Sequence, residues 1–177
     1  MAAARLHGQT APQVLDLCAG SGCVGLGVAS LCPTAQVTAV ELSEAALLYL
    51  RENVSRYPNL SVTVRQGNVL TDWAPYGEYD AILSNPPYIP TADLPALMRE
   101  VQHEPRMALD GDADGLAFYR VIAKQWCSHL RDGGFCAVEV GYDQAQPVKA
   151  LFEEAGLKHC AIYPDLAGIP RVVVGEK

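Results

Sequence analysis

Residues 13–25 read QVLDLCAGSGCVG, and this stretch decides the fold. Its first five residues, 13–17, are mostly apolar, which is typical of a buried strand. A glycine-rich turn follows, and the apolar pattern after the turn predicts a helix that runs to Leu31. A strand, a tight turn and a helix in this order indicate the first unit of a parallel α/β sheet.

Three glycines in this turn have the spacing Gly-x-Gly-x-x-Gly: Gly20, Gly22 and Gly25. The first two can adopt positive φ and let a ligand approach the backbone closely, while Gly25 lets the helix pack tightly on the sheet. The spacing alone is a weak signal, but its place between a strand and a helix favours a cofactor loop.

The rest of the chain alternates short strands with helical patterns. Strands are expected over 36–40, 61–66, 79–83, 135–140, 157–163 and 171–174, helices over 44–57, 116–130 and 144–155, and a loop over 90–105. We therefore predict an α/β fold with a seven-stranded, mostly parallel sheet, helices on both faces and a C-terminal antiparallel hairpin.

The length of 177 residues suits one domain with a substantial core. Residues 1–12 have no periodic pattern and are expected to be a loose leader or an artificial chain boundary, with the domain over 13–177. The formal charge of −7 argues against a stand-alone nucleic-acid binder. No apolar run reaches bilayer length and no signal-peptide core follows Met1, so we expect no membrane partner.

The six cysteines show no Cys-x-x-Cys pair and no accompanying histidine cluster. They are Cys18, Cys23, Cys32, Cys127, Cys136 and Cys160. Their scatter through apolar segments indicates reduced thiols in a cytoplasmic protein, without a metal site.

A second motif, Asn85-Pro86-Pro87-Tyr88, follows the strand expected at 79–83. Each proline fixes φ and lacks an N–H, so the segment is stiff and Asn85 is restrained. The side-chain oxygen of Asn85 and the carbonyl of Pro86 can then accept both N–H bonds of one planar NH2 group. Tyr88 offers a flat face on which a planar group can stack.

Such an NH2 group is a poor nucleophile, because its lone pair is delocalised into the neighbouring π-system. Two fixed acceptors stabilise the positive charge that grows on the nitrogen when it attacks an electrophilic carbon. The motif therefore indicates chemistry on an amide or on an exocyclic base amine. The simpler interpretation is a rigid turn that leaves a strand.

Two carboxylates suggest which cofactor the turn binds. Glu41 ends the second strand about twenty residues after the turn, where a carboxylate can accept both hydroxyls of a ribose. A nicotinamide dinucleotide would also fit this pair of features. Asp16, however, places a negative charge beside the turn, which repels a pyrophosphate and suits the ammonium of an amino acid. The pattern favours S-adenosylmethionine.

The third strand is followed by Asn68 and Val69. Asn68 could contact the edge of an adenine and Val69 its face, although Asn68 is also an ordinary turn residue.

With these motifs the chain resembles a class I, Rossmann-like methyltransferase that uses S-adenosylmethionine. More narrowly, it is similar to the catalytic domain of the protein-(glutamine-N5) methyltransferases of peptide chain release factors, the HemK/PrmC family. The resemblance includes four further sets of stretches: Glu104-Pro105 with Ala108-Leu109, Asp114-Gly115-Leu116 with Tyr119-Arg120, Glu139-Val140-Gly141 with Gln144, and Asp165-Leu166-Ala167-Gly168 with Arg171-Val172-Val173. It spans nearly all of residues 13–175.

The resemblance implies methyl transfer to the side-chain amide nitrogen of the glutamine in a Gly-Gly-Gln loop of a release factor. The implied cofactor residues are Asp16, Ala19, Gly20, Ser21, Gly22, Cys23, Glu41, Leu42, Asn68, Val69 and Asn85. The implied substrate residues are Asn85, Pro86, Pro87 and Tyr88, of which Asn85, Pro86 and Tyr88 are catalytic. Family members usually carry an N-terminal helical domain that docks the release factor, and this sequence shows no such segment. We expect a monomer.

Two other functions fit parts of the pattern. The same motif suits the N6 amine of a flipped adenine in DNA or RNA, although the acidic balance does not favour that substrate. A methyltransferase fold can also serve as a non-catalytic, cofactor-binding subunit of a partner.

Overall fold

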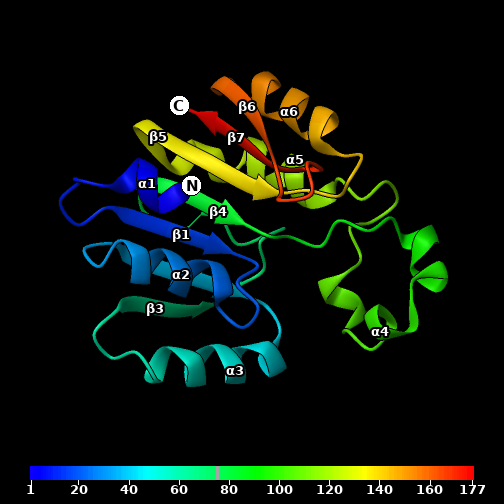
Figure 1. The fold of residues 1–177 in the computed structure, drawn as a ribbon, viewed down its shortest axis with the longest axis horizontal. Coiled ribbons are helices and arrows are strands. Elements are labelled where there is room, and N and C mark those ends of the chain that lie inside the picture. The colour runs from blue at the N-terminus through cyan, green and yellow to red at the C-terminus, as the bar shows by residue number, and fades with distance from the viewer. Residues whose placement is uncertain (75) are drawn as a thin grey trace.

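The computed structural model describes residues 1–74 and 76–177. Within these residues seven strands form one sheet in the order β3-β2-β1-β4-β5-β7-β6 (Figure 1). Its strands are β1 Gln13–Leu17, β2 Gln36–Glu41, β3 Ser61–Gln66, β4 Tyr79–Ser84, β5 Leu130–Glu139, β6 Lys158–Pro164 and β7 Pro170–Glu176. Strands β1 to β5 are mutually parallel, and β7 is antiparallel to both β5 and β6. The predicted fold class is confirmed.

The α-helices are α1 Ala2–Leu6, α2 Cys23–Leu31, α3 Glu44–Ser55, α4 Arg99–Gln102, α5 Ala117–Lys124 and α6 Ala145–Glu154. Three short 3-10 helices are η1 Thr91–Ala96, η2 Arg106–Ala108 and η3 Trp126–His129. Figure 1 shows α2 and α3 on one face of the sheet and α5 and α6 on the other.

Alternation along β1 divides the core between these two faces. Val14 packs with α2 in one cluster, while Leu15 and Leu17 pack in another with Trp126 and with residues of α5 and α6. Successive side chains of a strand point to opposite faces, so a strand covered on both sides is apolar almost throughout. This explains why 13–17 lacks the polar alternation of a half-exposed strand.

The N-terminal segment differs from the loose leader that the sequence predicts. Residues 2–6 form α1, Leu6 is fully buried, and Arg5 forms an ion pair with Glu176 of β7. A five-residue helix carries too weak a periodic signal to be read from sequence, and it forms here because Leu6 joins the core beside α2. Both termini lie together at the amino edge of the sheet (Figure 1).

Further boundaries differ from prediction, and β5 begins at Leu130, ahead of the strand expected over 135–140. The helix expected over 116–130 ends at Lys124, and η3 follows it, because the indole N–H of Trp126 donates to the carbonyl of Val69 at 2.8 Å. The loop expected over 90–105 contains η1 and α4, and with η2, which follows it, these project from the sheet as a lobe over residues 90–112 (Figure 1).

The register of the parallel strands brings distant segments to one edge. Leu17 is level with Val40 on β2 and with Ser84 on β4, so the residues that follow β1, β2 and β4 meet at the carboxyl edge. In open parallel sheets ligands bind at this edge. Among the helices of the described residues, none has the length and apolar character needed to cross a bilayer.

Candidate active site

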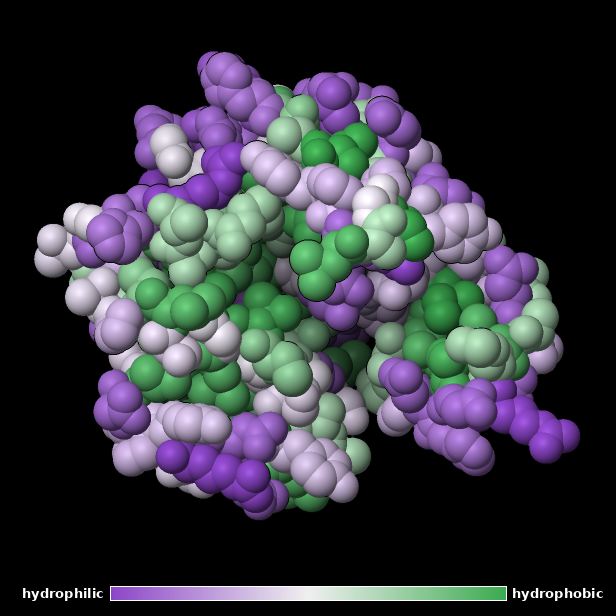
Figure 2. All heavy atoms as spheres, viewed as in Figure 1, coloured by the Kyte–Doolittle hydropathy of each residue, from purple (hydrophilic) through white to green (hydrophobic). Residues whose placement is uncertain are grey.

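A cavity of about 710 Å³ opens at the carboxyl edge of the sheet. It is bounded by the glycine-rich turn after β1, the end of β2, the turns after β3 and β4, the lobe and the start of α5. In Figure 2 the surface is hollowed between the body of the molecule and the lobe. The cavity has the size of small-molecule and cofactor pockets, which range from about 300 to 1,000 Å³.

The turn after β1 lines the inner end of the cavity through Ala19, Gly20, Ser21 and Cys23. Gly20 has φ of 57°, and a Cβ built on it would meet nothing within 4 Å, so its backbone faces open space. Gly22 does not line the cavity and has a structural role. It caps α2 with φ of 91°, and a Cβ there would lie 2.6 Å from the side chain of Leu50.

Glu41 ties this turn to the end of β2. One carboxylate oxygen accepts the backbone N–H of Gly20 at 2.7 Å, and the other accepts those of Leu42 and Ser43 at 2.9 and 2.8 Å. A carboxylate has about four lone-pair positions. One position therefore remains, on the oxygen that faces Gly20, for a hydroxyl donor in the cavity.

Asp16 lies behind the turn and does not line the cavity. It is 1 % exposed, and one of its oxygens accepts the N–H of Gly25 at 2.8 Å. The other oxygen is buried without a hydrogen-bond partner among the described residues. Desolvation raises the pKa of Asp16 to about 7, against the lowering effect of the Gly25 N–H, and the charge of Glu41 raises it further.

The turn after β3 contributes both of its candidate residues, Asn68 and Val69, to the lining. The side-chain oxygen of Asn68 accepts the N–H of Leu70 at 2.9 Å, so the residue also shapes its own turn. Val69 is buried beneath the cavity, with its carbonyl held by the indole of Trp126. Leu42 lines the same side and is partly exposed.

The motif after β4 divides between the cavity and the core. Asn85 is exposed and lines the cavity together with Pro87, whereas Pro86 and Tyr88 do not. Pro86 is buried, and Tyr88 packs its partly buried ring against the core cluster. Burial raises the pKa of Tyr88 and keeps its phenol neutral.

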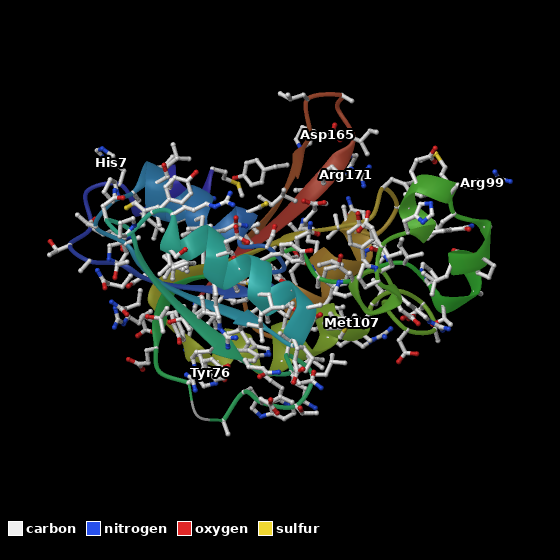
Figure 3. The ribbon with its side chains drawn as sticks, turned by 90° about the horizontal axis from the view of Figure 1, so that it is seen from below. His7, Tyr76, Arg99, Met107, Asp165 and Arg171 are labelled. Carbon is white, nitrogen blue, oxygen red and sulfur yellow. The ribbon has the colours of Figure 1, made fainter. Side chains whose placement is uncertain are left out.

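The sequence did not predict the wall of the cavity that faces the motif. This wall includes Met107 from the lobe and Phe118 from α5. Figure 3 shows Met107 on the side of the lobe toward the sheet and Arg99 at its far end. The only sequence signal was the resemblance of residues 104–109 to the family, because strand and helix spacing do not reveal how a loop folds back.

A hydrogen-bond network braces the base of the lobe. Asp110 accepts from the hydroxyl of Thr91 at 2.6 Å and from the guanidinium of Arg106 at 3.0 Å. The Thr91 bond, with Arg106, lowers the pKa of Asp110 and makes it a weak base. Among the residues with described positions, no group of three or more side chains suited to hold a metal ion occurs.

The parallel sheet with its reversed seventh strand, together with the cavity at the carboxyl edge, defines a class I, Rossmann-like methyltransferase domain. A family model described as "Methyltransferase small domain" matches residues 2–112. The chain is 30 % identical to the solved protein-(glutamine-N5) methyltransferase (release factor-specific) from Alicyclobacillus acidocaldarius, with a TM-score of 0.60, and covers 86 % of that chain and 99 % of its own.

Curated relatives extend this match. The release factor glutamine methyltransferase of Geobacter sulfurreducens is 44 % identical over 94 % of the chain, and that of Caulobacter vibrioides is 43 % identical over 93 %. The chain therefore belongs to the family of release factor glutamine methyltransferases, which confirms the resemblance found in its sequence. It spans 58 % and 57 % of the length of these two relatives.

Proposed function

We propose that this chain transfers the methyl group of S-adenosylmethionine to the side-chain amide nitrogen of the glutamine in a Gly-Gly-Gln loop of a peptide chain release factor. The observation that carries the proposal is that one cavity joins the glycine-rich turn, Glu41 and Asn85. A cofactor held by the first two features would thus share its space with an acceptor suited to an amide.

The residues present fit S-adenosylmethionine, which supplies an electrophilic methyl on a sulfonium. The open backbone at Gly20 admits the methionine part, with Ala19, Ser21 and Cys23 beside it. The unpartnered oxygen of Asp16 lies outside the cavity lining and is a buried acceptor suited to the ammonium end through a bridging water.

The part of the cavity lined by Glu41 and by the turn after β3 suits the nucleoside. The free lone pair of Glu41 accepts one ribose hydroxyl, and the second can take the position that the N–H of Gly20 uses in this structure. We assign the adenine to Asn68 and Val69, which line the cavity together with Leu42.

On the substrate side, Asn85 and Pro86 act on the amide nitrogen of the glutamine. Only Asn85 of these two lines the cavity, so the proposal requires the carbonyl of Pro86 to reach the amide from outside the cavity lining. The two oxygens would then accept the N–H bonds, fix the plane of the amide and stabilise the positive charge that develops on nitrogen. Tyr88 remains neutral and packs behind the motif, while Pro87 restricts its backbone.

The bond changes are those of a direct displacement. A bond forms between the amide nitrogen and the methyl carbon, the carbon–sulfur bond breaks, and its electron pair stays on sulfur. The nitrogen then loses one proton to water. Of the carboxylates in the cavity wall, Asp110 is engaged by Thr91 and Arg106 and is a weak base. We propose that deprotonation follows methyl transfer.

The test measures incorporation of labelled methyl into a purified release factor by the wild-type chain, by Asn85→Ala and by Asn59→Ala. Asn59 is the matched control, since it is also an exposed asparagine but lies before β3 and away from the cavity. We expect label on the Gly-Gly-Gln glutamine, at least a hundredfold loss in kcat for Asn85→Ala by analogy with loss of one oxyanion-hole donor, and no loss for Asn59→Ala.

Two results would overturn the proposal in different ways. Absence of label with the wild-type chain at saturating release factor would remove the activity. Undiminished label with Asn85→Ala would remove only the role of Asn85. A DNA or RNA duplex in the same assay tests adenine methylation, which the formal charge of −7 does not favour.

A further inference from the structure

Gln144 stands immediately before α6 and is one of the few buried polar residues of the described chain, at 7 % exposed. Its amide nitrogen donates to the carbonyl of Tyr88 at 2.8 Å and to that of Gly115 at 3.4 Å. Its amide oxygen accepts the N–H of Gly141 at 3.0 Å. One side chain thus joins the motif after β4, the segment before α5 and the segment after β5.

The packing around Tyr88 has no spare room. A Cβ built on Gly115 would lie 2.3 Å from the Tyr88 carbonyl oxygen and 2.5 Å from the amide nitrogen of Gln144. A Cβ on Gly111 would lie 2.8 Å from the Tyr88 Cα. The glycines bring the backbone close enough for Gln144 to reach the motif.

The motif depends on this anchor for a chemical reason. Pro86 and Pro87 have no N–H, so these two residues cannot donate backbone hydrogen bonds that would fix their place. Tyr88 follows the proline pair. Gln144, which stands before α6, fixes the backbone of Tyr88 by donating a hydrogen bond to its carbonyl. Because Pro86 and Pro87 have fixed φ angles, a displacement of the Tyr88 backbone would also displace Asn85.

We propose that Gln144 is a positioning residue that sets the direction of the Asn85 side chain at the cavity. It does not line the cavity, so it acts through the motif and not on the substrate. The inference rests on the proposed function, because it takes residues 85–88 as the substrate site.

The role requires a carboxamide. One end of the side chain must donate to Tyr88 and accept from Gly141, and an ionised carboxylate can only accept. When it is ionised, the glutamate of Gln144→Glu therefore places a carboxylate oxygen against the Tyr88 carbonyl. When protonated, the same glutamate can donate again, so activity relative to wild type should rise as pH falls.

The experiment compares wild type, Gln144→Leu, Gln144→Glu and Val148→Ala. Val148 is the control, because it is fully buried one turn further along the same helix and its truncation destabilises the core without removing a hydrogen bond to Tyr88. For each protein kcat and KM for release factor are measured well below the unfolding midpoint, together with S-adenosylhomocysteine affinity by calorimetry. Side-chain amide resonances of Asn85 are recorded by NMR without ligand.

We expect Gln144→Leu to lose at least tenfold in kcat and to shift the Asn85 resonances, with cofactor affinity within twofold of wild type. Gln144→Glu should recover toward wild type between pH 8 and pH 6, and Val148→Ala should keep both kcat and resonances. If Gln144→Leu does not fold, the pH profile and resonances of Gln144→Glu decide.

Unmoved Asn85 resonances in both Gln144 variants would overturn the inference, as would a kcat loss that Val148→Ala shares. If wild type methylates no release factor, the proposed function fails by itself, and the resonances still report whether Gln144 orients the motif.

Discussion

Replacing Asp16 by asparagine should make the stability of the cofactor-free protein less dependent on pH. The wild-type carboxyl is buried, and one of its oxygens lacks a partner, so the folded state disfavours its charge. Desolvation raises its pKa from 3.8 to about 7. Between these values the folded protein binds a proton that the unfolded chain has released. The stability that depends on a neutral Asp16 is therefore fully present below pH 4 and is lost as pH rises to 7 and above.

The size of the effect follows from the shift. A difference of about three pKa units corresponds to about 4 kcal/mol at 1.36 kcal/mol per unit. Asparagine places a neutral donor at the unpartnered position, as the protonated carboxyl does, and its oxygen can keep the Gly25 N–H. Near pH 5 the free energy of unfolding of the variant should lie within about 2 kcal/mol of the wild-type value. Between pH 5 and pH 9 the difference should grow by ~3 kcal/mol in favour of the variant.

Urea unfolding of both proteins at pH 5, 6, 7, 8 and 9 measures this difference. Carboxylates elsewhere titrate equally in both proteins and cancel in the comparison. The reasoning would be refuted if the difference in free energy of unfolding between the two proteins stayed constant with pH, or if it shifted in favour of wild type at high pH. The stabilised variant should bind S-adenosylhomocysteine more weakly by calorimetry, because it lacks the negative charge for the ammonium.

Two further predictions concern the same turn. Gly25→Ala would place its Cβ 2.8 Å from an Asp16 oxygen and 3.1 Å from Val37, so it should destabilise the protein by about 1–3 kcal/mol in urea unfolding; an unchanged midpoint would contradict this packing. Glu41→Gln loses one carboxylate oxygen, either the one that accepts from Gly20 or the one that accepts from Leu42 and Ser43. The affinity for S-adenosylhomocysteine, measured by calorimetry, should therefore fall about tenfold or more. A change under twofold would remove Glu41 from the nucleoside site.

The sequence predicted the sheet well because its signals are local. Each strand has its own apolar run, and Gly22 and Ser43 start α2 and α3 through their own conformation and hydrogen bonding. The carboxyl edge then follows from parallel register alone, so the order of strands and motifs along the chain is enough to place Glu41 and Asn85 at the same edge.

The parts that were not predicted depend on contacts between distant segments. The helix that starts at Ala117 ends at Lys124, and Trp126 then donates a hydrogen bond to the carbonyl of Val69. The spacing of apolar residues within 116–130 does not reveal this distant partner. Met107 reaches the cavity only because the lobe folds back. The sequence left Asn68 open as either a turn residue or a ligand contact. In the structure its side chain accepts a hydrogen bond within its own turn, and the residue also lines the cavity.

The ion pair between Arg5 and Glu176 has a practical consequence for handling the protein. Both chain ends leave from the amino edge, while the cavity opens at the other edge, at the far end of β1. A five-residue strand spans about 17 Å at ~3.3 Å per residue. An affinity tag or sensor-chip attachment at either end would therefore leave the cavity mouth accessible, and a short loop from residue 177 to residue 1 would give a circular permutant with new ends elsewhere.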